Sequence, residues 1–406
     1  MTSSAPSVAA DATDEAVPEG IWGRISREFR SGNLGSLPVA AALVVIVIIF
    51  SQTAQNFFTA VNFNNLITQL AGTCLLAYGV VFVLLLGEID LSIGYVSGVA
   101  GVIVAELQLP GRGVPGLICI ILAVVGGALI GAFQGSIVAL VGVPSFVVTI
   151  AGFEIWQGVI LKSIPQGVIV IQNNTINNMD GYFFSDAAGW IIAAVVSAIY
   201  VLSVGSGAFS QVRHGVAIRN RALLAAKLLV VPAASFLIVY ICNKDRGLPF
   251  PLLLIVAALL ILTFLAKRTT FGRHVYAVGG NAEAARRAGI NVARIRILVF
   301  TISGAMSALG GVVLAARLNS VDLNAGGGTL LIDAISAAVI GGTSLFGGRG
   351  EVRNGLFGAL VIATIANGLN TIGYTSGIIF IVTGAILLMA VTHDTVLRRI
   401  QARSGR

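Results

Sequence analysis

Long apolar runs recur along almost the whole chain after residue 36, and they restrict this sequence to one class of fold. Each run is about 20 residues long, the length that an α-helix needs to cross the hydrocarbon core of a bilayer. Only 10% of the 406 residues are charged and 56% are hydrophobic, whereas an ordinary soluble domain carries about 25% charged residues. The polar side chains are therefore too few to cover a water-exposed surface. The sequence predicts an all-α fold, a polytopic bundle of membrane-spanning helices.

Twelve segments are candidates for these helices, and because several are short for a crossing we expect about 10–12 transmembrane segments. The candidates are residues 35–55, 63–86, 93–107, 116–140, 144–161, 189–205, 222–242, 249–266, 295–316, 329–346, 353–372 and 377–393.

The two ends of the chain differ in composition from the apolar region between them. Residues 1–34 are polar and acidic, with a basic cluster that leads into a run continuing as a span, unlike a secretory signal. We expect this segment to be a disordered cytoplasmic arm. Residues 35–396 are predicted to form a single transmembrane domain, and residues 397–406 a basic cytoplasmic tail.

Basic residues predict the orientation. If the amino terminus is cytoplasmic and all twelve segments cross, 20 of the 25 Lys and Arg residues lie on the cytoplasmic side. This bias predicts that both termini are cytoplasmic. It also accounts for the formal net charge of +8, so the charge gives no reason to expect a nucleic-acid partner. The three cysteines and three histidines lack the paired spacing of metal sites, and no metal is assigned.

Two carboxylates interrupt an apolar stretch in LLLGEIDLSIG (residues 84–94), where Gly87 and Gly94 bracket Glu88 and Asp90. Glycine in a membrane segment permits a break, and the freed backbone groups then need other partners. Asp90, with Ser92 two residues on, is placed to cap a helix that starts near Ile93. Two interpretations stay open: a capping turn without solute contact, or a role in gating or lining a pathway. Intramembrane acids also serve as proton relays, so this motif alone fits a proton-driven carrier equally well.

Other polar side chains within the predicted spans are few, and they either face an aqueous pathway or hydrogen-bond to neighbouring helices. They are Gln134, Glu154, Trp156, Gln157, Asn367 and Asn370. Residues 162–188 form a long polar and aromatic outer loop, which either packs over an entrance, meets an external partner or is a plain surface loop.

The most charged internal segment is residues 267–294. Asn281 is a good N-cap, Glu283 falls in the first turn of a short helix, and Gly289 can supply a left-handed C-cap. A helix of under two turns is too short to be stable alone. It must rest either on lipid head groups or on a cytoplasmic partner.

The motif EAARRAG at residues 283–289 resembles the EAA-type loop of ABC importer permeases, whose short helix seats in a groove of the ATP-hydrolysing subunit. YAVGGNAEAARRAGINV (276–292) is similar to the version carried by ribose/xylose-type sugar permeases. GEIDLSIG (87–94) and AVIGGTSLFGG (338–348) resemble two further motifs, in that family's order. Three features resemble the xylose branch of this family: Glu88, the segment NKDRGLPFPLLL (243–254) and the additional apolar segments between 189 and 266.

This resemblance implies the membrane-spanning subunit of an importer for a monosaccharide, xylose or a related sugar, in a bacterial cytoplasmic membrane. It also implies a second permease subunit, expected as an identical copy, an extracytoplasmic sugar-binding protein, and a cytoplasmic ATPase that binds ATP and Mg. The coupling-loop residues it implies are Gly280, Asn281, Glu283, Ala284, Ala285, Arg286, Arg287 and Gly289.

No catalytic residue is expected in this chain. The sequence has no G-x-x-x-x-G-K-[ST] motif, and its GRGVPG (111–116) sits in a short loop with no strand before it. We therefore expect no cofactor here and ATP hydrolysis in another polypeptide. The rival classes are an ion-coupled carrier and a membrane enzyme, and the latter would need an acid, base or metal cluster that the sequence does not suggest.

Overall fold

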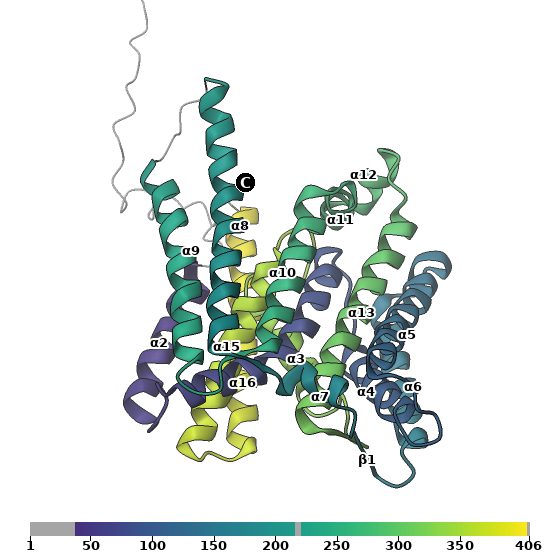
Figure 1. Ribbon diagram of the computed structural model, residues 1–406. Coiled ribbons are helices and arrows are strands. Elements are labelled where there is room, and N and C mark those ends of the chain that lie inside the picture. Colours follow the sequence, from purple (N-terminus) through teal and green to yellow (C-terminus); the bar gives the residue numbers. More distant parts are fainter. Residues whose placement is uncertain (1–36, 216–220, 404–406) are drawn as a thin grey trace, which may run out of the picture.

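The computed structural model describes residues 37–215 and 221–403, and most of these residues are helical (Figure 1). The α-helices are α2 (Leu37–Thr53), α3 (Ala60–Leu85), α4 (Ile93–Leu107), α5 (Gly116–Ser136), α6 (Ser145–Ser163), α7 (Asn174–Gly181), α8 (Asp186–Arg213), α9 (Arg221–Cys242), α10 (Phe250–Arg268), α11 (Thr270–Gly280), α12 (Ala282–Arg287), α13 (Val292–Leu318), α14 (Leu330–Ile340), α15 (Val352–Ile372) and α16 (Ser376–Arg403). A π-helical turn, η1 (Ile137–Val141), extends α5.

Two short antiparallel strand pairs complete the fold. β1 (Val168–Val170) pairs with β4 (Ser320–Asp322), with Ile169 opposite Val321. β2 (Phe183–Phe184) pairs with β3 (Leu248–Pro249). Each pair fixes part of the loop at residues 162–188 against a distant segment. This loop, expected from sequence as a long polar connection, is therefore folded.

In the described part of the chain, eight helices are long and apolar enough to cross a membrane, and four shorter apolar helices occur at 39–53, 93–107, 330–340 and 376–389. Together they correspond one to one with the twelve predicted segments. The prediction of a polytopic all-α membrane bundle is confirmed.

Two predicted boundaries differ from the structure. The segment predicted over 329–346 is helical only from Leu330 to Ile340. Beyond it, Gly342, Gly347 and Gly348 adopt positive φ angles of 102°, 85° and 72°, which a helix cannot contain. At the carboxyl end α16 continues to Arg403, so the basic tail predicted from residue 397 begins inside a helix. The predicted arm at residues 1–34 lies outside the described residues.

The molecule has two ends that carry different structure (Figure 1). α11 and α12 lie at one end, hereafter the α12 end, and α7 and β1 lie at the other, hereafter the β1 end. The loop at residues 341–351 also reaches the α12 end, where the Tyr276 hydroxyl donates a 2.8 Å hydrogen bond to the Gly350 carbonyl.

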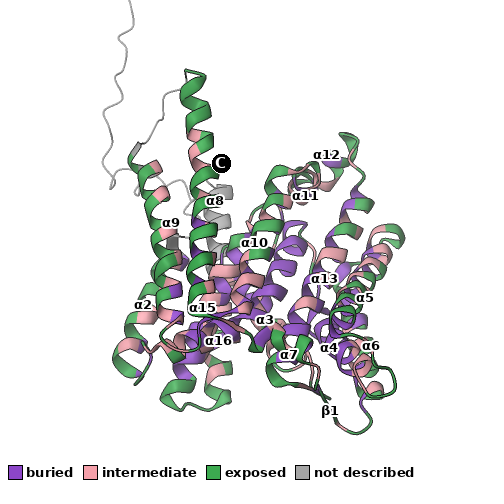
Figure 2. Ribbon diagram, viewed as in Figure 1, coloured by how far each residue is buried: buried purple, intermediate pink, exposed green. Residues whose placement is uncertain are grey.

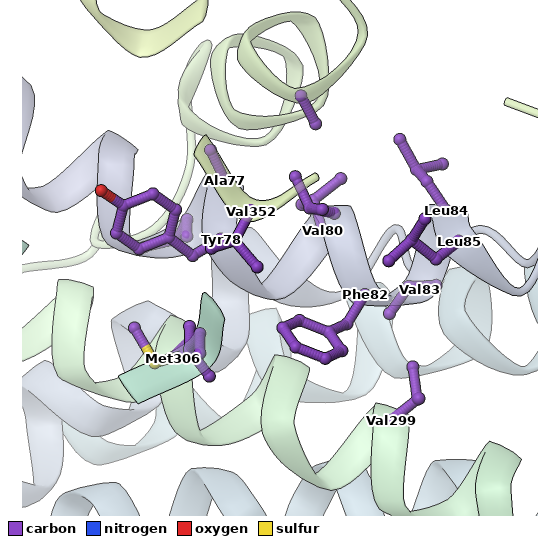
Figure 3. Packing of buried hydrophobic residues seen from close by; sticks show 14 of the residues in the cluster. Ala77, Tyr78, Val80, Phe82, Val83, Leu84, Leu85, Val299, Met306 and Val352 are labelled. Carbon is purple, nitrogen blue, oxygen red and sulfur yellow. The ribbon is translucent and has the colours of Figure 1, made fainter. Parts of the chain in front are cut away.

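α3 is the centre of the bundle, with 83% of its most apolar stretch buried (Figure 2). Its Tyr78 and Phe82 lie beside Met306 and Val299 of α13 in the largest hydrophobic cluster (Figure 3). By contrast, only 17% of the most apolar stretch of α8 and 6% of that of α9 is buried. Apolar helices with so little protein around them fit lipid contact.

Glycine allows α5 and α13 to approach closely. A Cβ added at Gly131 would lie 2.1 Å from the Phe300 carbonyl oxygen, and one at Gly304 would lie 2.1 Å from that of Gly127. Small residues at helical spacing favour such backbone contact between membrane helices. This contact fixes the position of α13, which begins directly after α12 and carries residues that meet the break.

Candidate functional site

α12 is a short helix whose two ends are both capped by the chain itself. The Asn281 side chain accepts a 2.9 Å hydrogen bond from the Ala284 amide. At the other end Gly289, with φ +84°, lets its amide bond to the Arg286 carbonyl and the Ile290 amide bond to the Ala285 carbonyl, both at 3.0 Å. These two bonds form a Schellman motif, which satisfies carbonyls left free at a helix end. The N-cap and the glycine C-cap predicted from sequence are confirmed.

Only one side chain of α12, that of Ala285, is buried against the bundle. Glu283, Arg286 and Arg287 expose 57%, 65% and 80% of their side chains. Glu283 forms ion pairs with Arg286 at 3.0 Å and with Arg287 at 3.4 Å. Gly280, Asn281 and Ala284 are exposed as well. α12 therefore directs its charged side chains away from the protein and packs against the bundle through Ala285.

α11 connects α12 to the bundle and packs against the end of α3. Its Phe271 ring stacks on Phe82 of α3 with ring centroids 6.4 Å apart, and a Cβ at Gly279 would overlap the Leu85 carbonyl, at 1.8 Å. Burial, with the charge of Glu351 adding to it, raises the pKa of Tyr276 above its ordinary value. The phenol therefore stays protonated as the donor to Gly350. α12 is thus mounted on the end of the most buried helix of the bundle.

The break predicted between Gly87 and Gly94 is present between α3 and α4, at residues 86–92. Gly87 has φ +75°, and α4 begins at Ile93 as predicted. The Ile89 amide donates to Ser145 Oγ at 3.2 Å, and Thr149 Oγ1 donates to the Ile89 carbonyl at 3.3 Å. Side chains of α6 therefore satisfy both backbone groups of Ile89, which lies at the middle of the break, as membrane segments require.

Asp90 is the centre of a buried polar cluster within the bundle. Its Oδ1 accepts hydrogen bonds from the amide and the hydroxyl of Ser92, at 3.0 and 2.7 Å, and its Oδ2 accepts one from Ser303 at 3.0 Å. Asp90 is 6% exposed. The amide that it satisfies belongs to the N-cap residue of α4, Ser92, rather than to a residue inside that helix. The predicted capping role is therefore present in a modified form.

Gln134 of α5 joins this cluster. Ser92 Oγ lies 2.9 Å from Gln134 Oε1 as well as 2.7 Å from Asp90 Oδ1. A serine hydroxyl has one proton, so it can donate to only one of these oxygens at a time. The Gln134 Nε2 is buried without a hydrogen-bond partner among the described residues. The cluster, hereafter the Asp90 cluster, consists of Asp90, Ser92, Gln134 and Ser303, and it keeps one unused polar group.

Glu88 lies at the other end of the break and points to a different residue of α13. Its carboxylate forms an ion pair with Arg296 at 3.0 Å, and the exposed fractions of the two side chains are 14% and 29%. Arg296 and Ser303 were not predicted as site residues. A basic residue at the start of a predicted span and a serine inside one were visible in the sequence, but neither reveals its partner.

The structure does not bring the remaining predicted candidates to this cluster. Asn367 of α15 instead donates to Asn62 and Gln69 of α3, at 2.9 and 3.4 Å. Asn370 and Glu154 are exposed. Trp156 and Gln157 are partly buried on α6, and the Trp156 Nε1 has no hydrogen-bond partner among the described residues.

A cavity of about 310 Å³ lies on the β1 side of the break, between α4, α13, β4 and the loop that precedes α14. Ser97, Ser320, Asp322 and Asn324 supply its polar side chains. In the described part of the chain no three His, Cys, Asp or Glu side chains gather in a way that could hold a metal ion.

The model of one protein family, described as "Branched-chain amino acid transport system / permease component", matches residues 62–391. The chain belongs to this permease family. The matched range contains both the break and α12.

Named relatives cover almost the whole chain. The xylose transport system permease protein XylH of Escherichia coli (strain K12) is 38% identical over 91% of this chain and 94% of its own length. XylH of Haemophilus influenzae is 34% identical over 91% and 98%. The ribose import permease protein RbsC of Bacillus subtilis (strain 168) is 32% identical over 87% and 90%. No solved structure matches this chain.

Proposed function

We propose that this chain is the membrane-spanning subunit of an ATP-driven importer for xylose or a related monosaccharide. The observation that carries the proposal is α12, a doubly capped helix that exposes Glu283, Arg286 and Arg287 at one end of a membrane bundle. A helix of this size has little stability by itself. A short helix that is capped at both ends and exposes its charges therefore suits contact with a protein partner. The relatives named for xylose and ribose support a monosaccharide as the solute.

The partner at α12 would be a separate cytoplasmic ATPase, which holds ATP and Mg. Movement of that ATPase would be passed through α12 and alternate the access of the solute pathway between the two sides. A second copy of this chain and an extracytoplasmic sugar-binding protein would complete the importer.

The α12 end would then be the cytoplasmic side. This orientation agrees with the basic residues of α11, α12 and the start of α13, because basic loops favour the cytoplasm. Both termini would then lie in the cytoplasm and the β1 end outside, in a bacterial cytoplasmic membrane.

The solute pathway would pass between the cavity at the β1 end and the Asp90 cluster. The cavity of about 310 Å³ lies within the range of pockets that hold small molecules, roughly 300 to 1,000 Å³. Its polar side chains and the unused amide of Gln134 could exchange hydrogen bonds with sugar hydroxyls. Glu154, Trp156, Gln157, Asn367 and Asn370 would then serve contacts between helices, within this chain or with the second copy, rather than the solute.

The experiment that tests the ATPase partner is gentle purification of the tagged protein from its own membranes, with mass spectrometry of what accompanies it. The variant carries Glu283→Ala and Arg287→Glu. The matched control carries Glu106→Ala and Arg112→Glu, which removes an ion pair of 3.0 Å away from α12. We expect an ATPase with the wild type and the control and its loss from the α12 variant. A protein that is purified alone in every case would overturn the proposal and favour an ion-coupled carrier.

The solute is tested separately in cells that lack their own pentose uptake. Expression of the importer should restore accumulation of radiolabelled xylose, and unlabelled ribose should compete less well than unlabelled xylose. Equal competition by both sugars would contradict the assignment to xylose and retain the monosaccharide class.

A further inference from the structure

The ion pair between Glu88 and Arg296 joins the two functional segments of the chain. Glu88 belongs to the break, and Arg296 lies in the second turn of α13, nine residues after the end of α12. Their side chains are 14% and 29% exposed, whereas the ion-paired side chains of α12 are 57% to 80% exposed. The pair at Glu88 is therefore directed into the protein and not toward a partner.

The path from α12 to Arg296 is short, and hydrogen bonds hold its linker to both helices. Only residues 288–291 separate α12 from α13 (Figure 1). The amides of Gly289 and Ile290 bond back to α12, and the Asn291 side chain accepts a 2.9 Å hydrogen bond from the Arg294 amide to cap α13. A linker with these bonds has little freedom to absorb a displacement. A movement of α12 must therefore reach the first turns of α13.

A cavity of about 350 Å³ lies beside this linker, lined by Arg286, Arg296, Ala139 and residues 289–293. The linker is thus unpacked on one side. The hydrogen-bonded linker can therefore move together with α12 on this side without first displacing a packed core.

The break meets α13 at two places. Glu88 pairs with Arg296, and Asp90 accepts a hydrogen bond from Ser303. Arg296 and Ser303 are seven residues apart, so they lie on one face of α13, about 10 Å apart along its axis. The Asp90 contact is buried, whereas the Glu88 contact is partly open to solvent. A partly exposed ion pair stabilises the fold only modestly, so it can form and separate during a cycle.

We propose that the Glu88–Arg296 pair is the positioning contact through which movement of α12 reaches the intramembrane break. The pair connects the first turns of α13 to the break. The break leads directly into α4 and is hydrogen-bonded to Ser145 and Thr149 at the start of α6. Without the pair, α12 still binds the ATPase, but its movement no longer moves the break. This inference rests on the proposed function, because it assumes that an ATPase acts at α12.

The test uses the complete importer, with ATPase and binding protein, reconstituted in proteoliposomes. Uptake of radiolabelled xylose and ATP hydrolysis are measured on the same vesicles and expressed as ATP hydrolysed per xylose imported. The variants are Glu88→Gln, Arg296→Gln and the exchanged pair Glu88→Arg with Arg296→Glu. Arg296→Lys keeps the charge, and Glu106→Gln removes a carboxylate from the 3.0 Å pair with Arg112, away from α12.

Each glutamine variant should raise the ATP cost per xylose by about threefold or more, with the ATPase still bound. The exchanged pair and Arg296→Lys should return the ratio to within about twofold of the wild type, and Glu106→Gln should leave it unchanged.

The proposal is overturned if uptake and hydrolysis fall together at a constant ratio, or if the exchanged pair is as uncoupled as the single variants. Loss of the ATPase from the glutamine variants would also contradict it, because the pair would then serve docking. If the wild type imports xylose without any ATPase, the proposed function itself fails, and this outcome is visible before any variant is made.

Discussion

α12 and the break at residues 86–92 use charged side chains in opposite ways. In α12 the three charged residues pair with one another and stay largely exposed. In the break Asp90 is buried with its oxygens occupied, and Glu88 pairs with a residue of another helix. Exposed charges remain available to a partner, whereas buried charges are expensive unless they are paired within the protein. The comparison teaches that the charges of α12 stay accessible from outside the chain, whereas those of the break are directed to partners within the bundle.

This difference predicts that single substitutions in the two segments affect separate properties. Changes in the break should lower the stability of the bundle, and changes in α12 should lower partner binding with little effect on stability. Substitutions at Asp90, then at Gly87 and Gly289, and finally at Glu283 test the comparison in order of decreasing effect on stability.

The largest effect is expected at Asp90. Asp90→Ala leaves the Ser92 amide and the Ser303 hydroxyl without their acceptor, and the Ser92 hydroxyl keeps only Gln134 Oε1. Because a buried polar group without a partner costs about 1 to 3 kcal/mol, we expect the free energy of unfolding to fall by roughly 3 kcal/mol. Asp90→Asn, which keeps the shape and one acceptor oxygen, should lose about 1 kcal/mol. Reversible unfolding in detergent with increasing SDS measures both. Equal losses for the two variants would show that the hydrogen bonds of Asp90 do not decide the stability of the break.

Much of this architecture was predictable because its signals are local. Length and hydropathy predicted the twelve segments, Gly87 and the carboxylates predicted the break, and Asn281 and Gly289 predicted both ends of α12. Each of these predictions depends on residues within a few positions of one another, where backbone geometry and capping chemistry act directly.

The contacts that give these segments their roles were not predictable. Ser303 is 213 residues from Asp90 in the sequence, and Arg296 is similarly far from Glu88. No local pattern specifies which serine or arginine of a distant helix will be the partner, because the packing of α3, α5 and α13 decides this. The same reason explains Asn367, whose partners Asn62 and Gln69 belong to α3.

A smaller effect is expected at two glycines that share a backbone conformation. Gly87 in the break has φ +75°, and Gly289 after α12 has φ +84°. A side chain in this left-handed region costs about 1 kcal/mol. At Gly87 the added Cβ would also lie 3.2 Å from the Phe346 carbonyl oxygen, whereas at Gly289 nothing lies within 4 Å. Gly289→Ala should therefore lower the free energy of unfolding by about 1 kcal/mol and Gly87→Ala by about 2 kcal/mol, measured in the same SDS titration. A larger loss at Gly289 would reverse the comparison, because the exposed segment would then contribute more to stability than the break.

The smallest effect on stability is expected at Glu283. Glu283→Gln removes two ion pairs, but all three side chains are more than half exposed, and such pairs contribute at most about 0.5 kcal/mol. The SDS titration should therefore barely distinguish this variant from the wild type. If the proposed ATPase docks at α12, the same substitution should weaken its retention during purification, because Arg286 and Arg287 lose their partner within the helix. Arg112→Gln, which breaks a partly exposed pair away from α12, should alter neither property. A loss of stability at Glu283 as large as that at Gly87 would mean that the charges of α12 hold the fold, and the division between an outward-directed and an inward-directed segment would have to be abandoned.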